Sequence, residues 1–387
     1  MLRGPTGRYH ITNVGGETVR AFIPHPLPPE PPLELTAQRQ QLLERATLAL
    51  GRLDSITLLL PDPDIFLYAY VRREAVLSSQ IEGTQSSLAQ LLLFELDEAP
   101  GAPIDDVIEV SNYVAALDYG LKRLQDGFPF SNRLIRDMHA ILLRQGRGSE
   151  RQPGEFRRSQ NWIGGTRPGN AVFVPPPPEE VPDCMAALER FLHGERNPYP
   201  TLIKAALAHV QFETIHPFLD GNGRIGRLLI AFILHHDRLL SRPLLYLSLY
   251  LKQHRAEYYR LLDLVRLQGD WEAWIDFFLE GVEQTATNAV DTARRLLALF
   301  RQHEQTIQQT GRISANALRV FRALCERPLM NLPQVCAGTG LSFPTVNKAM
   351  QVLQQIGITR EITGRQRNRI FAYQAYLDVL NEGTEAL

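Results

Sequence analysis

Several features that mark other classes of protein are scarce in this sequence. Only three of its 387 residues are cysteines, and the spacing of Cys184, Cys325 and Cys336 matches neither a disulfide framework nor a zinc site. No run of about 18 uninterrupted apolar residues occurs. The first residues also lack the apolar segment of a signal peptide. We therefore expect reduced thiols, no membrane partner and a cytoplasmic location.

A dominant charge is missing as well. The 41 lysines and arginines nearly balance the 42 aspartates and glutamates, which gives a formal net charge of −1. The chain as a whole is therefore not attracted to nucleic acid or acidic membranes, and such binding would need a local patch. What the chain does have is length, because 387 residues, of which 44% are hydrophobic, suffice for two or three domains with their own cores.

The most informative stretch, residues 216–227, reads HPFLDGNGRIGR and lies between two apolar segments with helical spacing. Pro217 hinders continuation of the first helix past His216. The second helix is expected to begin near Gly223 or Arg224. A glycine-bearing turn at a helix start presents backbone N–H groups and the positive end of the helix dipole, which together suit a phosphate.

The polar side chains of this stretch fit nucleotidyl or phosphoryl transfer. His216 can act as a base near neutral pH. Asp220 offers the hard oxygen ligand that suits Mg²⁺ bridging phosphates. Arg224 and Arg227 are three residues apart and therefore share one helical face, from which both can reach bound phosphates. A plain turn with solvated arginines is the simpler interpretation, but the combination of all these residue types favours transfer.

HPFLDGNGRIGR resembles the signature loop of the Fic family, whose members mostly transfer AMP from ATP to hydroxyl side chains of proteins. The resemblance implies that His216 deprotonates the target hydroxyl and that Asp220 holds Mg²⁺. It also implies that Phe218 anchors the loop, while Gly223, where phosphorylating relatives carry a larger residue, favours adenylylation. The implied ATP-binding residues are Gly221, Asn222, Gly223, Arg224, Ile225, Gly226 and Arg227, with Glu82 beside them.

Residues 78–83, SSQIEG, form a second motif. Ser78 and Glu82 lie four apart on one helical face, and Gly83 suits a helix C-terminal cap. An acidic residue in the last helical turn opposes the helix dipole, so we expect a cation beside Glu82. Next to a Fic signature the motif resembles the family's inhibitory motif, which implies that Glu82 pairs with Arg227 and displaces the γ-phosphate.

Residues 160–174 contain the strongest β signal that we identify. The segments 161–163 and 171–174 flank the turn GGTRPGN, which predicts a hairpin. In the family this segment is the flap that binds the target's backbone as an extra strand, so the partner is a protein substrate, with this protein itself one candidate. By contrast, residues 1 to about 35 are rich in proline and predict an extended surface arm.

Two further regions extend the expectations. Tyr258 and Tyr259 match paired tyrosines near the family's adenine pocket, with Tyr259 the better candidate. The C-terminal pattern of three helices and two strands with a polar tip predicts a winged helix, a fold that often places its third helix in the DNA major groove. Between residues 348 and 369 the single acid is Glu361, and the cations are Lys348, Arg360, Arg365, Arg367 and Arg369. DNA binding and a docking or dimerisation role both remain open.

We therefore predict a mainly α-helical protein that has a Fic helical core with a β-hairpin flap and a C-terminal winged helix. Residues 1–104 would be the arm and regulatory helices, 105–296 the catalytic core, and 297–387 a linker helix and the winged helix. The expected function is Mg²⁺-dependent transfer of AMP from ATP to a Ser, Thr or Tyr hydroxyl of a protein, inhibited by Glu82. The alternatives are a DNA-binding regulator with a nucleotide-sensing core, and transfer of another phosphoryl or nucleotidyl group. A homodimer is a candidate assembly.

Overall fold

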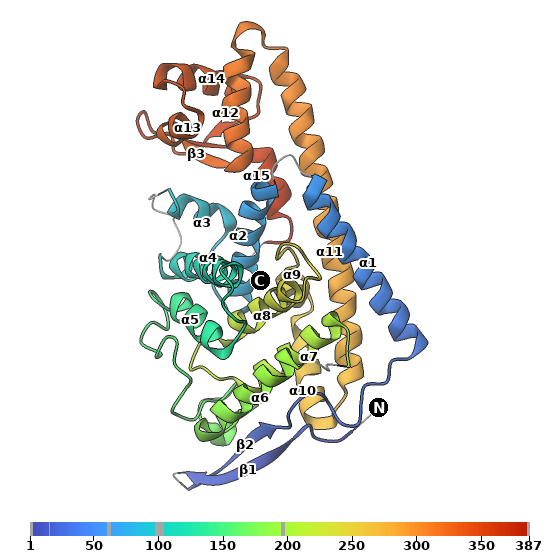
Figure 1. Cartoon of the computed structure of the whole chain (residues 1–387). Coiled ribbons are helices and arrows are strands. Elements are labelled where there is room, and N and C mark those ends of the chain that lie inside the picture. Colours follow the sequence, from blue (N-terminus) through green and yellow to red (C-terminus); the bar gives the residue numbers. More distant parts are fainter. Residues whose placement is uncertain (1–2, 15, 60–62, 97–103, 195–197, 385–387) are drawn as a thin grey trace.

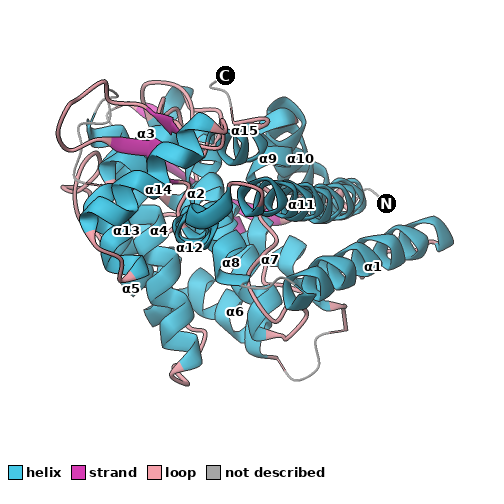
Figure 2. Cartoon of the chain, turned by 90° about the horizontal axis from the view of Figure 1, so that it is seen from above, coloured by secondary structure: helices cyan, strands magenta, loops and turns pink. Residues whose placement is uncertain are grey.

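The computed structural model describes residues 3–14, 16–59, 63–96, 104–194 and 198–384. It is mainly helical, as predicted (Figure 2). The longer helices are α1 (Ala37–Leu59), α2 (Pro63–Ile81), α4 (Ile104–Gln125), α5 (Asn132–Leu142), α6 (Val181–His193), α7 (Thr201–Ile215), α8 (Asn222–His236), α10 (Arg255–Gln268), α11 (Trp271–Gln308), α12 (Ser314–Glu326) and α14 (Phe343–Gln355). The shorter ones are α3 (Leu88–Phe94), α9 (Ser248–Gln253), α13 (Leu332–Thr339), α15 (Gln374–Asn381) and the 3₁₀ turns η1 (Pro168–Asn170), η2 (Pro178–Glu180) and η3 (Gly311–Ile313). No helix within the described ranges is both long and apolar enough to span a membrane.

Helices α7 and α8 form the centre of the core. Every residue of α7 from Leu202 to Ile215 is buried, as expected for a helix with apolar residues on all faces. Helix α8 packs along α7, and α4, α5 and α2 also contact α8. The segment 216–221 that joins α7 to α8 therefore starts and ends inside well-packed elements, which fix its position.

An antiparallel hairpin occupies part of the region that we predicted to be an extended arm. Strands β1 (Gly7–Val14) and β2 (Glu17–Pro24) pair in full register from Gly7 opposite Pro24 to Val14 opposite Glu17. The prediction was wrong for these residues because the proline-rich run that suggested an arm begins only at Pro24, the last residue of β2. The alternation of the apolar Val19 and Ala21, both buried, with the exposed Thr18 and Arg20 was the available signal.

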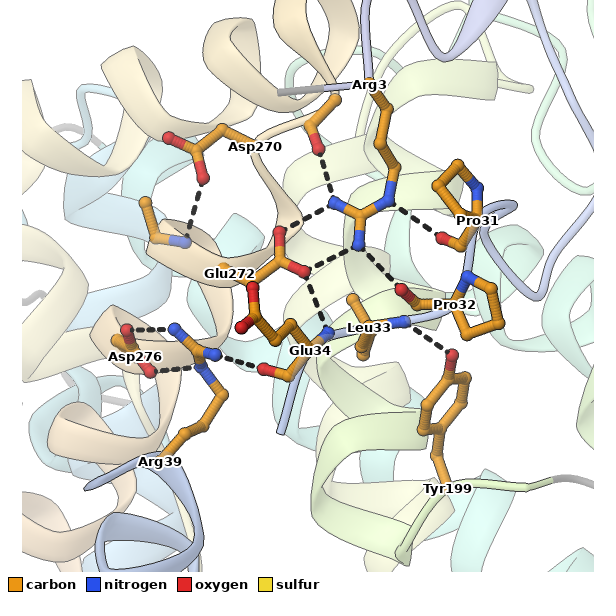
Figure 3. Close-up of polar contacts among 12 residues, drawn as sticks. Arg3, Pro31, Pro32, Leu33, Glu34, Arg39, Tyr199, Asp270, Glu272 and Asp276 are labelled. Atoms are coloured by element: carbon orange, nitrogen blue, oxygen red, sulfur yellow. Dashed lines mark hydrogen bonds and ion pairs between the residues drawn. The ribbon is translucent and has the colours of Figure 1, made fainter. Parts of the chain in front are cut away.

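The remaining arm, residues 25–36, is fastened to the N-terminal end of α11 (Figure 3). Arg3 donates to both carboxylate oxygens of Glu272 and to the carbonyls of Gly269, Pro31 and Pro32. Glu272 also accepts the backbone N–H of the arm residue Glu34. We call this set of contacts, centred on Arg3 and Glu272, the N-terminal clasp.

The predicted flap hairpin is reduced to a single bridge between Ile163 and Phe173. The N–H groups of Val172 and Phe173 both donate to the carbonyl of Ile163. Residues 160–174 form no more extended ladder than this. The two segments that we expected to pair are therefore antiparallel, but their pairing is short. The turn contains η1, and the prolines from residue 175 onward lack the N–H groups that would extend the pairing. Strand β2 lies beside this flap, because Phe22 N–H donates to the carbonyl of Val174.

Helix α11 is one continuous helix of 38 residues that runs past residue 296, where we expected the catalytic core to end and a linker helix to follow. It runs along one side of the molecule with α1 beside it (Figure 1). Beyond it, α12, β3 (Leu329–Asn331), α13, α14, β4 (Arg360–Glu361) and β5 (Ile370–Ala372) follow in order. The antiparallel sheet has the order β3-β5-β4. The sheet adds β3 to the two strands that we expected, and the winged helix stays a prediction.

The end of the chain returns to helix α2, which carries the SSQIEG motif. Helix α15 contacts both α11 and α2. The side chain of Gln80 donates to the carbonyl of Thr384, and Arg73 donates to the carbonyl of Glu382. The C-terminal residues therefore lie directly against the helix that we predicted to be regulatory.

Candidate active site

The residue that ends α7, His216, has an unusual backbone conformation. Its φ of 49° and ψ of 60° are left-handed, which few residues other than glycine adopt. The Arg157 guanidinium holds it there by donating to the carbonyls of His216, Ile215 and Pro176. Arg157 is 2% exposed, so these hydrogen bonds lie inside the protein. They connect the signature segment to Pro176, just after the flap.

The centre of the segment is fixed by Asn222 and His139. The Asn222 side chain accepts the N–H of Phe218 at 2.9 Å and donates to the carbonyl of the same residue at 2.8 Å. Phe218 is fully buried, as we expected, and stacks on the His139 ring with centroids 3.7 Å apart. His139 accepts the Gly154 N–H at Nδ1, so its Nε2 carries the proton that it shares with the Asp220 carbonyl at 3.0 Å. His139, which lies on α5, therefore supports this loop.

The His216 imidazole is neutral in its surroundings. Burial, followed by the positive charges of Arg157 and Arg266, lowers the pKa of His216 to about 4. Its Nδ1 is buried, so Nε2 is the nitrogen available to an incoming group. A neutral imidazole with an accessible lone pair can accept a proton at neutral pH.

The start of α8 forms an anion cradle. Gly221, with φ 74°, precedes the helix in a left-handed conformation, and the first intrahelical hydrogen bond is the one that Ile225 donates to Gly221. The N–H groups of Asn222, Gly223 and Arg224 precede that bond and lie at the positive end of the helix. The predicted nest therefore has the required backbone geometry, whereas the side chain of Ile225 is in the core.

Asp220 fits the role of a single carboxylate ligand. Its side chain is 37% exposed, and one oxygen accepts the Gly221 N–H at 2.6 Å. Across the described ranges no cluster of three or more metal-binding side chains was found. Mg²⁺ commonly takes one or two protein carboxylates and completes its shell with phosphates and water. Asp220 beside the cradle meets that requirement.

Arg227 is held by the SSQIEG motif of α2. It donates from Nε to Ser78 Oγ at 2.9 Å, and from Nη2 to the Ser78 carbonyl at 2.9 Å and Glu82 Oε1 at 2.8 Å. Burial disfavours the Glu82 carboxylate, but the charge of Arg227 outweighs this and lowers the pKa of Glu82. Gly83 follows in a left-handed conformation, with φ 100°, and ends the helix. The structure thus brings the two predicted motifs together.

Gly223 makes room for that contact. A Cβ atom built at Gly223 would lie 2.2 Å from Glu82 Oε1 and 3.0 Å from Arg227 Nη1. Gly226 has a similar function toward α7, because a Cβ there would lie 2.3 Å from Glu213 Oε1. Both glycines are therefore required by close approach of carboxylates to α8 and not by backbone conformation.

Family comparisons agree with this site. A model described as Fic/DOC family N-terminal matches residues 40–122, and a model described as Fic/DOC family matches residues 129–234. The chain therefore contains a Fic/DOC N-terminal region and a Fic/DOC domain. The matched ranges include the Ser78–Gly83 motif and the His216–Arg227 loop, which carried the resemblance.

Solved Fic structures share the fold. A Fic family protein from Desulfovibrio desulfuricans G20 aligns over 89% of this chain and 98% of its own, with a TM-score of 0.59 and 22% identity. Fic-1 from C. elegans covers 66% of this chain and 74% of its own, with a TM-score of 0.51 and 23% identity.

Curated relatives are more similar in sequence over a shorter range. Proteins named protein adenylyltransferase Fic from Drosophila ananassae and Drosophila melanogaster are 32% identical over 208 residues, or 53% of this chain. The matched part is 39% of each relative, so this chain spans about two fifths of their length.

The paired tyrosines lie in different environments. Tyr258 is 1% exposed, and its hydroxyl lies 2.9 Å from Nε2 of His209. Tyr259 is 40% exposed, and the charges of Glu82 and Arg227 both affect its pKa, which burial raises. Of the two rings, that of Tyr259 reaches the surface, and its contact with a nucleotide stays a prediction.

Three functional neighbours escaped the sequence analysis. Arg157 and Arg266 set the charge around His216, and Arg266 also lies 4.0 Å from the ring of the flap residue Phe173. Glu109 of α4 lies 2.9 Å from Arg224. Each is distant in sequence from the loop it contacts, and a buried arginine or glutamate within a helical or loop pattern gives no local signal of its partner.

Proposed function

We propose that this protein is an adenylyltransferase that transfers AMP from ATP to a Ser, Thr or Tyr hydroxyl of a protein. The observation that carries the proposal is the neutral His216 next to the anion cradle at the start of α8. The names of the Drosophila relatives support the same chemistry. The acceptor is a protein, and this chain itself is one candidate.

His216 acts as the general base. As the acceptor hydroxyl attacks the α-phosphorus of ATP, its proton passes to Nε2 of His216. The new bond joins the acceptor oxygen to the α-phosphorus, the bond between the α-phosphorus and the bridging oxygen breaks, and pyrophosphate leaves. The low pKa of His216 keeps the imidazole in its proton-accepting form throughout the neutral range.

The cradle binds the phosphates and stabilises the charge that develops on them. Backbone N–H groups of Asn222, Gly223 and Arg224 donate to phosphate oxygens, and the Arg227 guanidinium takes the γ-phosphate. Asp220 would hold Mg²⁺, which neutralises phosphate charge when it is bound. Tyr259 lies where it can contact the nucleotide.

Glu82 opposes this arrangement by occupying Arg227. The Glu82 carboxylate, on the residue after the end of α2, binds the Arg227 guanidinium that the γ-phosphate needs. Productive ATP binding therefore requires the pair to separate. A coupling of about 1–3 kcal/mol between two such ligands changes affinity roughly 5- to 150-fold. Residues 1–104 would then be the regulatory region, 105–296 the catalytic core, and 297–387 an accessory region.

The test is incorporation of label from ATP labelled at the α-phosphate. His216→Ala is expected to abolish labelling of protein, while ATP binding, measured by titration calorimetry, stays within about threefold because the cradle is intact. His236→Ala, at the exposed end of α8, is the matched control and should label normally. Undiminished labelling by His216→Ala would contradict the base assignment.

The transferred group and the role of the C-terminal region have separate tests. Mass spectrometry of the product distinguishes AMP from phosphate or another nucleotide. A second candidate function, DNA binding, is favoured by the wing, where Arg360, Arg365 and Arg367 are exposed. A mobility-shift assay at two salt concentrations tests it, because phosphate contacts weaken steeply as salt rises.

A further inference from the structure

A buried carboxylate of α4 contacts the first arginine of the signature loop. Glu109 Oε1 lies 2.9 Å from Arg224 Nη1, and the two side chains are 2% and 1% exposed. The other oxygen of Glu109 lies 3.2 Å from Nη2 of Arg147, a residue whose side chain is 52% exposed. Glu109 therefore bridges a fully buried arginine and one at the surface.

Arg224 has a second carboxylate neighbour on its own loop. Its Nη2 lies 3.3 Å from Oδ1 of Asp220, four residues earlier. The other oxygen of Asp220 faces residues 146–148, since a Cβ built at Gly148 would lie 2.7 Å from Asp220 Oδ2. The guanidinium thus lies between Glu109 and Asp220, closer to Glu109.

A buried guanidinium needs a counter-charge, and the choice of carboxylate matters here. An arginine that is 1% exposed is costly unless it is paired. If Glu109 were neutral, Asp220 would be the anion within reach, and a bidentate pair with Arg224 would occupy the oxygens that a hard cation needs. With Glu109 charged, Arg224 has a partner that is not part of the proposed metal site.

We propose that Glu109 is a positioning residue that draws one side of the Arg224 guanidinium to itself and so limits Arg224 to a single hydrogen bond with Asp220 Oδ1, which leaves Asp220 Oδ2 available to Mg²⁺ and its bound phosphates. This inference rests on the proposed function, because it concerns nucleotide and metal binding at the same site. Glu109 itself touches neither. It acts through Arg224 and lies on α4, outside the loop that carries the other site residues.

The test compares nucleotide binding with and without the metal. ATP affinity is measured in Mg²⁺ and in EDTA for the Glu82→Gly protein and for the same protein carrying Glu109→Gln. In the parent, Mg²⁺ should tighten ATP binding. In the Glu109→Gln protein this Mg²⁺-dependent gain should fall at least fivefold, because Arg224 then pairs with Asp220. Glu150→Gln neutralises an exposed carboxylate just after Arg147 in the sequence and should leave the Mg²⁺-dependent gain in ATP affinity within twofold of the parent.

The conservative variant separates positioning from mere folding. Glu109→Asp keeps the charge at a longer distance and should give a Mg²⁺-dependent gain between those of the parent and Glu109→Gln. If Glu109→Gln does not fold, this variant decides the question. A gain within twofold of the parent in the folded variants, even with a lowered melting temperature, would overturn the proposal.

Failure of this proposal and failure of the proposed function give different results. Transfer of labelled AMP by the parent is measured in parallel. If the parent transfers no AMP but its metal-dependent ATP binding responds to Glu109→Gln as expected, the positioning role holds and the transferase activity does not. If transfer occurs and the metal response is unchanged, only the role of Glu109 is lost.

Discussion

Two buried arginines of this protein bind glutamates at almost the same distance, yet their surroundings differ. Arg227 lies 2.8 Å from Glu82, and Arg3 lies 2.6 Å from Glu272. The arginine side chains are 2% and 3% exposed, but the Glu82 side chain is 32% exposed and that of Glu272 only 7%. One carboxylate can leave toward solvent, whereas the other is enclosed.

The remaining hydrogen bonds reinforce the difference. Arg227 donates otherwise only to Ser78 among the hydrogen bonds of the described residues, so its guanidinium can accept a phosphate once Glu82 departs. The N-terminal clasp binds Arg3 to three carbonyls in addition to Glu272 (Figure 3). Ion pairs of similar length can therefore act as a switch, if one side chain can move into solvent, or as a permanent contact, if both are enclosed.

The largest effect is expected from breaking the enclosed pair. Arg3→Ala leaves Glu272 buried without its counter-ion and should lower the free energy of unfolding by about 3–5 kcal/mol. Urea denaturation measures this. Arg8→Ala removes an ion pair whose arginine side chain is 58% exposed and should cost less than about 1 kcal/mol. Equal losses for both variants would remove the distinction between the two classes of pair.

Breaking the open pair should appear in activity. Glu82→Gly frees Arg227 for the γ-phosphate and should raise transfer of labelled AMP at least tenfold at fixed ATP, equivalent to about 1.4 kcal/mol. The same variant should lose less stability than Arg3→Ala, since Ser78 still binds the guanidinium. Equal transfer rates for the wild-type and Glu82→Gly proteins across a range of ATP concentrations would contradict inhibition by Glu82.

A methyl group at the open pair should have a smaller effect in the same direction. Gly223→Ala places Cβ where Glu82 Oε1 now lies, and the end of a flexible side chain can move away. We expect transfer to rise roughly fivefold, which corresponds to a coupling free energy of about 1 kcal/mol between Glu82 and ATP, the lower end of the typical range. In the Glu82→Gly background the same change should give no gain, which a double-mutant comparison of rates would reveal. A gain in both backgrounds would mean that the methyl group acts elsewhere.

The pH dependence of the enclosed pair gives a further test of the comparison. Burial raises the pKa of Glu272, but hydrogen bonds from Arg3 and the Glu34 N–H outweigh it and lower the pKa to about 2. A carboxylate with a depressed pKa contributes its stability above the unfolded value of about 4.3 and loses it as the pH falls toward 2. Thermal melts from pH 5 to pH 2 should show this loss in the wild type and a shallower slope in Glu272→Gln. Parallel slopes would contradict the assignment.

The sequence was most informative where function is concentrated in a short segment. The roles of His216, Asp220 and Arg227 follow from residue type and spacing within twelve positions, and the structure gives that segment the expected turn and helix start. The Glu82–Arg227 pair was also expected: a carboxylate in a last helical turn favours a nearby cation, and the resemblance to the inhibitory motif identified that cation as Arg227. The mainly helical fold followed from apolar periodicity.

What could not be predicted depends on contacts between distant segments. Nothing near Glu109 indicates Arg224, and nothing near Arg157 indicates the carbonyl of His216, because such pairs are created by helix packing. The flap hairpin is short because prolines follow it and because β2 bonds to its end at Val174. The continuity of α11 was missed although its buried residues recur every three or four positions from Trp271 to Leu296.

The continuity of α11 sets both the distance and the relative rotation between the elements at its two ends. Helix α11 joins the N-terminal clasp at Glu272 to the C-terminal region, where His303 bonds to Tyr373, and its 38 residues span about 57 Å. The helix contains no proline, and its one glycine, Gly281, is packed against Tyr250, so it has no evident kink site. Each residue of a helix advances about 100° around the axis. Inserting one residue between the two ends would therefore turn the C-terminal region through more than a quarter circle and carry α15 and Thr384 away from α2. The number of residues in α11 therefore determines the orientation of the C-terminal region relative to the active site.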